Sequence, residues 1–326
     1  MRPHTSSNLY HQRDLCSSVL GDGRPLLLLT GIGLALAGGF ALFLALTYQF
    51  LPHDIAFLGL TAEQLCTIND CRITGFMIHD RIAFGGALLV IGLLYLWLTE
   101  FPLQAGHVWA WWTLAASGVL GFGSFLTYLN TGYLDAWHGL ASLCLLPCFT
   151  IGLLRSWNHL LLRHMCFSWH PVAPLNWRSS FGMGRILLLL TALGMFGGGS
   201  TILTLGSTIV FVPQDLTFLC LTPAALNTIN ARLIPLIAHD RIGFGGAVAT
   251  TGIVIFNAVW FSSPSRHLWQ ILCLASLIGF GSAIGAHPFV GYLDAVHLAP
   301  AVLGGLASIL GLVFCYRSMM HSNKAS

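Results

Sequence analysis

The residues with the clearest chemical potential occur in one motif that the chain contains twice. His79-Asp80-Arg81 precedes a Gly-Gly pair, and the same pattern returns as His239-Asp240-Arg241. Histidine can bind a metal or move a proton, aspartate can orient a ligand, and arginine can bind an anion. Both motifs stand near the start of a long apolar segment, where ionisable groups are costly and are functional candidates by default.

A second repeated motif adds one aspartate and one histidine to each set. Asp135 and His138 belong to the block Gly-Tyr-Leu-Asp-Ala-x-His, and Asp294 and His297 belong to its second copy. A spacing of three residues places the two side chains on one face of a helix. Each half of the chain therefore offers two histidines, two aspartates and one arginine at one depth.

Four interpretations of these clusters are open. In the first they form a structural clasp, in which Arg81 pairs with Asp80 or Asp135 and the histidines tie helix ends together. In the second, two histidines are axial ligands of haem and an arginine binds a propionate. In the third, each half holds zinc or iron through its histidines and aspartates. In the fourth, the same residues relay protons in a transporter. The haem candidates are His79, Arg81, His138, His239, Arg241 and His297, and the metal interpretation adds Asp80, Asp135, Asp240 and Asp294.

The elements that position these residues are membrane helices. Only 8% of residues are charged, 56% are hydrophobic and the mean hydropathy is +0.77. A soluble domain carries about a quarter charged residues, so the composition excludes a soluble protein. The net charge of +3, without a basic run, gives no reason to expect nucleic acid as a partner. The expected partner is the lipid bilayer.

Eight apolar segments are long enough to span a bilayer, which takes roughly 20 residues in a helix. Helices are expected because the segments are far longer than barrel strands and do not alternate in polarity. The predicted spans are Pro25–Leu51, Ile73–Thr99, Val108–Leu129, Tyr133–Leu154, Ile186–Val212, Leu233–Phe261, Leu268–Ala286 and Tyr292–Tyr316.

The distribution of positive charge predicts the orientation. With the N-terminus inside, ten of the 14 lysines and arginines fall on the inner side, and only Arg72, Arg81, Arg232 and Arg241 fall outside. This is the positive-inside bias, so both termini are expected in the cytoplasm and both His-Asp-Arg motifs on the outer face. The polar first 24 residues fit a retained tail rather than a cleaved signal. The expected location is a bacterial inner membrane.

The motifs belong to an internal repeat that covers nearly the whole of each half. Pro52-x-Asp54 matches Pro213-x-Asp215, and Gly121-Phe122-Gly123-Ser124 matches Gly279-Phe280-Gly281-Ser282. We predict an all-α integral membrane protein whose eight transmembrane helices form two pseudo-symmetric four-helix bundles. Each repeat has an even number of helices, so their pseudo-two-fold axis should run along the membrane normal. The predicted units are 1–24 (cytoplasmic tail), 25–155 (first repeat), 156–185 (cytoplasmic linker), 186–316 (second repeat) and 317–326 (cytoplasmic tail).

The first outer loop of each half carries helix-start signals. Thr61-Ala62-Glu63-Gln64 fits a capping box, and Thr222-Pro223 fits an N-cap with proline at the first helical position. A short surface helix is therefore predicted in each half. Cys66 and Cys71 also lie in the first loop, where an oxidising compartment permits a disulfide. Two free thiols are the alternative.

Two resemblances extend these expectations. The repeated His-Asp-Arg and Gly-Tyr-Leu-Asp-x-x-His blocks resemble those of a family of duplicated, multi-pass bacterial membrane proteins, which implies the architecture over nearly the whole chain but no particular activity. The architecture is also similar to haem A synthase, where histidines on helices two, four, six and eight face haem and a cysteine pair lies in the first outer loop. Comparable places here are occupied by His79, His138, His239, His297, Cys66 and Cys71.

The sequence departs from haem A synthase at a carboxylate. That family has a glutamate three residues before a histidine that arginine directly follows, whereas Phe76 and Leu236 stand at the glutamate positions here. Asp80 and Asp240 also separate histidine from arginine. The resemblance therefore implies haem binding, with a redox role at the outer face, but not oxidation of a haem methyl group. A non-catalytic scaffold, a metal-dependent protein and a transporter stay open, as does whether the chain is an enzyme.

Overall fold

The protein is all helical in the computed structural model, which describes residues 20–133, 136–162 and 169–321. Within these ranges there are twelve α-helices, and eight of them are long and apolar enough to cross a membrane. The eight long helices are α2 (Arg24–Leu46), α5 (Arg72–Leu98), α6 (Val108–Leu126), α7 (Ala136–Leu162), α8 (Ser180–Ser207), α11 (Leu233–Phe261), α12 (Arg266–Val290) and α13 (Ala295–Met320).

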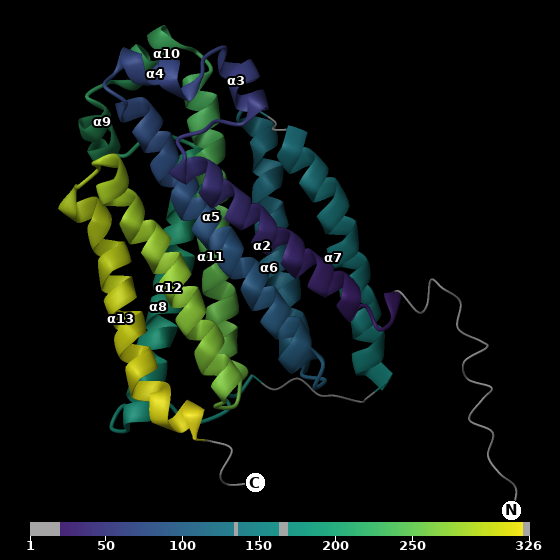
Figure 1. The fold of residues 1–326 in the computed structure, drawn as a ribbon. Helices are drawn as coiled ribbons and strands as arrows, with labels where there is room; N and C mark the ends of the chain where they lie inside the picture. Colours follow the sequence, from purple (N-terminus) through teal and green to yellow (C-terminus); the bar gives the residue numbers. More distant parts are fainter. Residues whose placement is uncertain (1–19, 134–135, 163–168, 322–326) are drawn as a thin grey trace, which may run out of the picture.

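Four short helices gather at one end of the bundle, which is termed the short-helix end (Figure 1). They are α3 (Pro52–Leu58), α4 (Ala62–Ile68), α9 (Pro213–Leu219) and α10 (Pro223–Ile229). The predicted helix starts are confirmed. The Thr61 hydroxyl accepts from the Gln64 amide at 3.2 Å, and the Gln64 side chain accepts from the Thr61 amide at 2.9 Å. The Thr222 hydroxyl accepts from the Ala225 amide at 3.2 Å, as an N-cap does.

At the end opposite the short helices, α7 and α8 extend beyond the spans that were predicted from hydropathy. α7 runs to Leu162 and α8 begins at Ser180, so both enter the segment that was predicted as a linker. Arg185, predicted at the edge of that linker, lies inside α8 and is only 1% exposed. Its guanidinium donates to the carbonyl oxygens of Ala173 and Val259, which satisfies a buried cation that the sequence pattern had placed at the surface.

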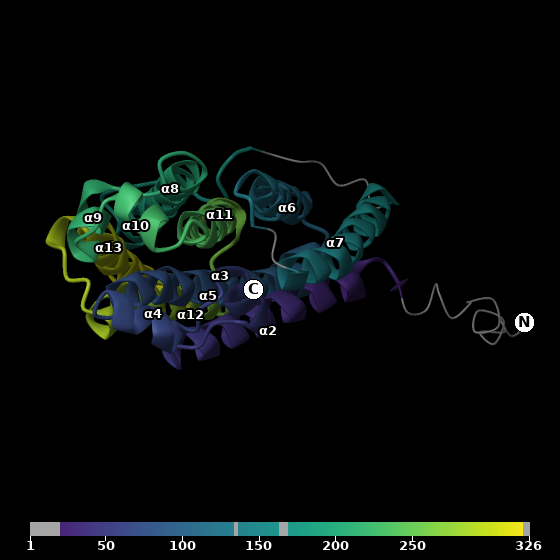
Figure 2. The ribbon, with the colours of Figure 1, turned by 90° about the horizontal axis from the view of Figure 1, so that it is seen from above.

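The central helices are α5 and α11, which lie side by side and are the two most buried of the eight (Figure 2). α5 also packs against α2 and α12, and α11 packs against α8 and α6. The prediction of one four-helix bundle from each half therefore differs from the observed packing. α12 contacts a helix of the first half, and α6 contacts a helix of the second half.

The Gly-Gly pairs provide the physical reason for this packing. The first glycine of each pair lies against the backbone of α2 or α8. The second glycine makes room for the helix that comes from the other half of the chain. A Cβ at Gly86 would collide with Ser282 of α12, and a Cβ at Gly246 would collide with Ser124 of α6. Small residues allow helix backbones to approach closely in lipid. Both faces of each central helix are thus occupied by neighbouring helices.

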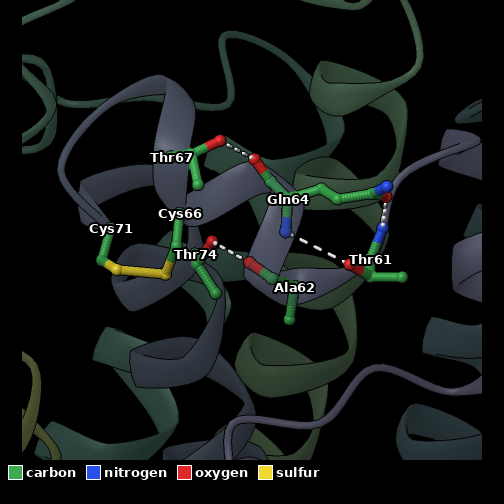
Figure 3. Close-up of a disulfide and its surroundings, with 7 residues drawn as sticks. All are labelled: Thr61, Ala62, Gln64, Cys66, Thr67, Cys71 and Thr74. Atoms are coloured by element: carbon green, nitrogen blue, oxygen red, sulfur yellow. Dashed lines mark hydrogen bonds between the residues drawn. A yellow bond between two sulfur atoms is a disulfide. The ribbon is translucent and has the colours of Figure 1, made fainter.

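The loop between α4 and α5 is closed by a disulfide between Cys66 and Cys71 (Figure 3). The same loop contacts α9, because the Asn69 side chain donates to the Leu219 carbonyl at 3.0 Å. In a similar contact, the Asn230 side chain donates to the Leu58 carbonyl of α3 at 2.8 Å. Each loop therefore satisfies a carbonyl at the end of a short helix from the other half.

Candidate functional site

Two arginines join the central helices through ion pairs that cross between them. Arg241 Nε lies 3.2 Å from Asp80 Oδ2, and Arg81 Nε lies 2.8 Å from Asp240 Oδ2. The clasp interpretation had paired Arg81 with Asp80 or Asp135. Among the described residues, Arg81 pairs with carboxylates of α11 and α3 and not with Asp80, while Asp135 lies outside the described residues. Adjacent residues of a helix do not face each other, so Asp80 and Arg81 point toward different neighbours.

The short helix α9 brings a second aspartate to Arg241. Arg241 Nη1 lies 2.7 Å from Asp215 Oδ2, and the Val212 amide donates to the same oxygen at 2.8 Å. The Tyr292 hydroxyl donates to Asp215 Oδ1 at 2.9 Å. Burial and the nearby Asp215 carboxylate raise the pKa of Tyr292, so its phenol keeps its proton and stays a donor. Asp215 is 0% exposed and depends on these donors, because a buried carboxylate is costly without them.

The short helix α3 makes the corresponding contact with Arg81. Arg81 Nη1 lies 2.8 Å from Asp54 Oδ2, and the Tyr133 hydroxyl donates to Asp54 Oδ1 at 2.6 Å. Burial alone would raise the pKa of Asp54, but the charge of Arg81 and the hydrogen bond from Tyr133 hold this pKa below its usual range. Asp54 is therefore ionised at neutral pH.

Three histidines converge on one side of the central pair, at the short-helix end. They are His79 of α5, His287 of α12 and His297 of α13, and one side-chain nitrogen of each lies within 4.8 Å of the others. His79 and His287 are each 3% exposed. The His297 side chain is 24% exposed, so this cluster, termed the three-histidine site, has one accessible side.

The loop between α12 and α13 fixes the positions of two of these histidines. α12 ends at Val290 and is capped by Gly291, whose φ of 76° is the left-handed conformation that glycine adopts at helix C-caps. The turn returns the Tyr292 carbonyl to within 2.7 Å of His287 Nδ1. Asp294 then caps α13 by accepting from the His297 amide at 2.7 Å, which places His297 in the first helical turn.

The hydrogen bonds assign the protons on two imidazole rings. His287 Nδ1 faces a carbonyl oxygen and His79 Nδ1 lies 2.9 Å from Asp80 Oδ1. Both partners can only accept, so both Nδ1 atoms carry the proton when the rings are neutral. The two Nε2 atoms, which are 3.2 Å apart, then face each other as lone pairs. Such a contact needs a proton or a metal ion between the rings.

The charges around the three-histidine site favour a cation between the Nε2 atoms of His79 and His287. Asp80 and Asp215 together carry two negative charges, and Arg241 neutralises only one of them. His79 Nδ1 and His287 Nδ1 each have an oxygen at hydrogen-bond distance, whereas His297 Nδ1 lies 3.9 Å from Asp215 Oδ1, which is too long for a hydrogen bond. Metal-binding histidines typically donate their other ring N–H to a carboxylate or carbonyl, as the rings of His79 and His287 do.

A different cluster lies on the other side of the central pair, around His239. His239 Nδ1 lies 3.2 Å from Asp240 Oδ1, and the rings of Tyr128 and Tyr133 lie 4.0 and 5.1 Å from the His239 ring, measured between centroids. The tilted ring of Tyr128 thus contacts His239 in the way that His287 contacts His79 on the other side. A cavity of about 70 Å³ lies beside this cluster and is lined in part by Arg81 and Asp240.

The structure brings one predicted site residue, His297, close to His79, together with His287. His79 was expected to act with His138, and that pairing stays a prediction. Asp135 and the side chain of His138 lie outside the described residues. Asp294 caps a helix, and Asp80 and Asp240 bind arginines. The sequence analysis did not identify His287, because this residue lies outside the repeated blocks. The only signal that could have indicated it is its position near the end of an apolar span.

Comparisons with protein-family models, with curated proteins and with solved structures found no match to this chain. The geometry of the sites is therefore the basis for assigning a function.

Proposed function

We propose that this chain is a membrane protein that binds one divalent first-row transition-metal ion through His79, His287 and His297. The observation that supports this most strongly is the contact between the Nε2 atoms of His79 and His287. In a tetrahedral site with metal–nitrogen distances of about 2.0–2.1 Å, two ligand nitrogens lie about 3.3 Å apart. The observed 3.2 Å matches that separation.

The ligand set indicates the class of ion. Neutral imidazole nitrogens suit zinc, copper, iron and nickel, whereas calcium and magnesium prefer oxygen. Three histidines leave a fourth position open, as in zinc sites that activate water or a substrate. The partly exposed side chain of His297 is where an ion would reach the site.

The same geometry favours an ion over haem at this position. Axial histidines lie on opposite sides of an iron, so their nitrogens are about 4 Å apart when each metal–nitrogen distance is about 2 Å. The 3.2 Å separation is shorter, and the His79 and His287 rings lie 4.5 Å apart between centroids, in contact with each other. No space for a porphyrin separates them. The haem expectation thus receives less support from this geometry than the metal interpretation.

We also propose that the chain is an internal duplication, with the short-helix end on the outer face and both termini in the cytoplasm. The matched motifs, the crossed ion pairs and the charge distribution along the sequence support this. In the proposed arrangement the two halves have diverged, because Tyr128 stands in the first half where His287 stands in the second. One metal ion per chain is therefore expected, not two.

Elemental analysis of the purified protein tests the proposal, with an absorption spectrum of the same sample. About one equivalent of zinc, copper, iron or nickel per chain is expected, without a Soret band. The His79→Ala and His287→Ala variants should each lose most of the bound metal. The matched control is His239→Ala, which removes the histidine of the other motif and should keep the metal.

Three results would contradict the proposal. One is a metal content that His79→Ala and His287→Ala leave unchanged in folded protein. Another is a Soret band that disappears in these variants, which would restore the haem interpretation. The third is a folded protein that binds no added metal, which would reduce the cluster to a structural contact.

A further inference from the structure

Three cysteines lie at one contact between the two halves of the chain, at the short-helix end. Cys66 and Cys71 form the disulfide, and Cys220 is a free, exposed thiol directly after α9. The other four free cysteines among the described residues all lie within candidate membrane spans. The three cysteines outside these spans therefore share one surface, and none of them belongs to the three-histidine site.

Side chains from the disulfide loop reach the residues around Cys220. Asn69, which lies inside the loop that the disulfide closes, donates to the carbonyl of the residue before Cys220 at 3.0 Å. Arg72, which directly follows Cys71, donates through Nη1 to Cys220 Sγ. Because residues on both sides of Cys71 contact the end of α9, the free thiol is held next to the disulfide loop.

The equivalent contact in the other half shows that this packing does not require cysteine. There, Asn230 and Arg232 donate to main-chain carbonyls of α3, as the corresponding residues of the disulfide loop donate to those of α9. Gly59 stands at the place of Cys220, and residues 227–232 contain no cysteine. The shared hydrogen bonds account for the docking of the loops, so the three sulfur atoms are an addition to one contact only.

The backbone at these cysteines adopts a conformation that glycine favours. The φ angles of Asp70, Cys71 and Cys220 are 45°, 59° and 52°, all in the left-handed region. At the place of Cys220 the other half has a glycine, Gly59, with a φ of 71°. A side chain kept at such a position indicates a role for that side chain. Opening the disulfide would also let Asp70 and Cys71 relax, and strained disulfides are those that exchange readily.

The three sulfur atoms have the environments that an exchange reaction needs. Cys71 and Cys220 are exposed, whereas Cys66 is half-buried on α4 (Figure 3). In disulfide exchange, a thiolate attacks one sulfur atom and the other leaves as a thiolate. Reactive cysteines typically have a cationic neighbour, and Arg72 supplies one to Cys220. Cys220 is thus the attacking group, and the exposed Cys71 is the sulfur that it attacks.

We propose that Cys66, Cys71 and Cys220 form a thiol–disulfide exchange site. The Cys220 thiol loses its proton to solvent and its sulfur attacks Cys71 Sγ. The bond between Cys71 and Cys220 forms, the bond between Cys66 and Cys71 breaks, and Cys66 leaves as a thiolate that takes a proton from solvent. One disulfide and one thiol are present before and after, so no oxidant or reductant is consumed. The new bond joins the end of α9 to the start of α5 and links the two halves covalently.

Disulfide mapping by mass spectrometry on the full chain in nanodiscs tests the proposal. The protein is shifted from acidic to mildly alkaline buffer, quenched with acid and alkylated. Peptides linked through Cys71 and Cys220 should accumulate together with alkylated Cys66. Arg72→Gln should slow this exchange about tenfold, because the charged hydrogen bond to Cys220 is lost. The matched control is Arg232→Gln, which loses the same kind of main-chain contact in the other half and should exchange at the wild-type rate.

Two further variants test the geometry separately from the rate. Cys66→Ser should form a disulfide between Cys71 and Cys220 when oxidised glutathione is added. Cys220→Ser should keep the original disulfide, the melting temperature and the metal content of the wild type, but should release no Cys66 thiol. The unchanged metal content separates this outcome from the metal proposal.

Four results would overturn the exchange site. They are a wild type without the Cys71–Cys220 link, a Cys66→Ser variant that does not form it, a link only between the Cys220 residues of two copies, and equal slowing by Arg72→Gln and Arg232→Gln. The last result would reduce Arg72 to a packing contact.

Discussion

Replacing Arg241 with methionine should destabilise the protein more than replacing Arg81, although both arginines occupy the same place in their motifs. The Arg241 side chain is 6% exposed, and the side chains of its partners Asp80 and Asp215 are 2% and 0% exposed. The Arg81 side chain is 14% exposed, and the side chains of its partners Asp240 and Asp54 are 8% and 3% exposed. Water therefore reaches the Arg81 cluster more readily.

The magnitude follows from the cost of an unpaired buried charge. Removing one partner of a buried ion pair typically costs about 3–5 kcal/mol, because the remaining charge stays desolvated. Arg241→Met leaves two carboxylates, which among the described residues keep hydrogen bonds from His79, Tyr292 and the Val212 amide and the longer contact with His297. We expect a loss of about 3–5 kcal/mol in the free energy of unfolding, and a smaller loss for Arg81→Met.

Equilibrium unfolding in mixed micelles, followed by tryptophan fluorescence, measures both losses. Combining Arg241→Met with Asp215→Asn should recover part of the stability, because one of the two unpaired charges is then removed. A loss below about 1 kcal/mol for Arg241→Met, or a larger loss for Arg81→Met, would refute the reasoning from burial.

Three further outcomes are expected. Cys66 and Cys71 should resist alkylation in membranes until a reductant is added, and ready labelling of both would exclude the disulfide in the native protein. A reporter fused after Lys324 should locate to the cytoplasm and one placed in the α3–α4 loop to the outside, whereas the reverse would invert the proposed orientation. The pKa of Asp54 lies below the unfolded value of about 3.9, so its contribution to stability is present above about pH 4 and is lost as the pH falls through the lower, folded pKa. Asp54→Asn should therefore reduce stability at pH 7 and much less near pH 3, and an equal loss at both values would contradict this origin.

The local features of the fold were readable from the sequence because they depend on neighbouring residues. The eight membrane helices follow from hydropathy, and the starts of α4 and α10 follow from Thr61 and Thr222. The packing of α6 against α11, and of α12 against α5, could not be predicted from neighbouring residues. It depends on Gly86 and Gly246, and a glycine pair indicates close packing without indicating which helix approaches.

The candidate site was only partly readable for the same reason. The repeated motifs led to His79 and His297, but the repeat also suggested that each half keeps its own histidines together. Packing across the halves brings these two into one site. His287 has no histidine at the matching place in the first half, so a search based on the repeat could not include it. The Nε2 contact that defines the site depends on the turn at Gly291, which no periodicity in the sequence reports.

X-ray absorption at the edge of the bound metal tests the central claim most directly. For protein loaded with zinc or cobalt, we expect a shell of nitrogen at about 2.0–2.1 Å with the outer scattering of three imidazoles. His287→Ala should reduce that scattering, and His239→Ala should leave it unchanged. A shell without imidazole, a sulfur shell at about 2.3 Å, or a spectrum that His287→Ala does not change would contradict the account.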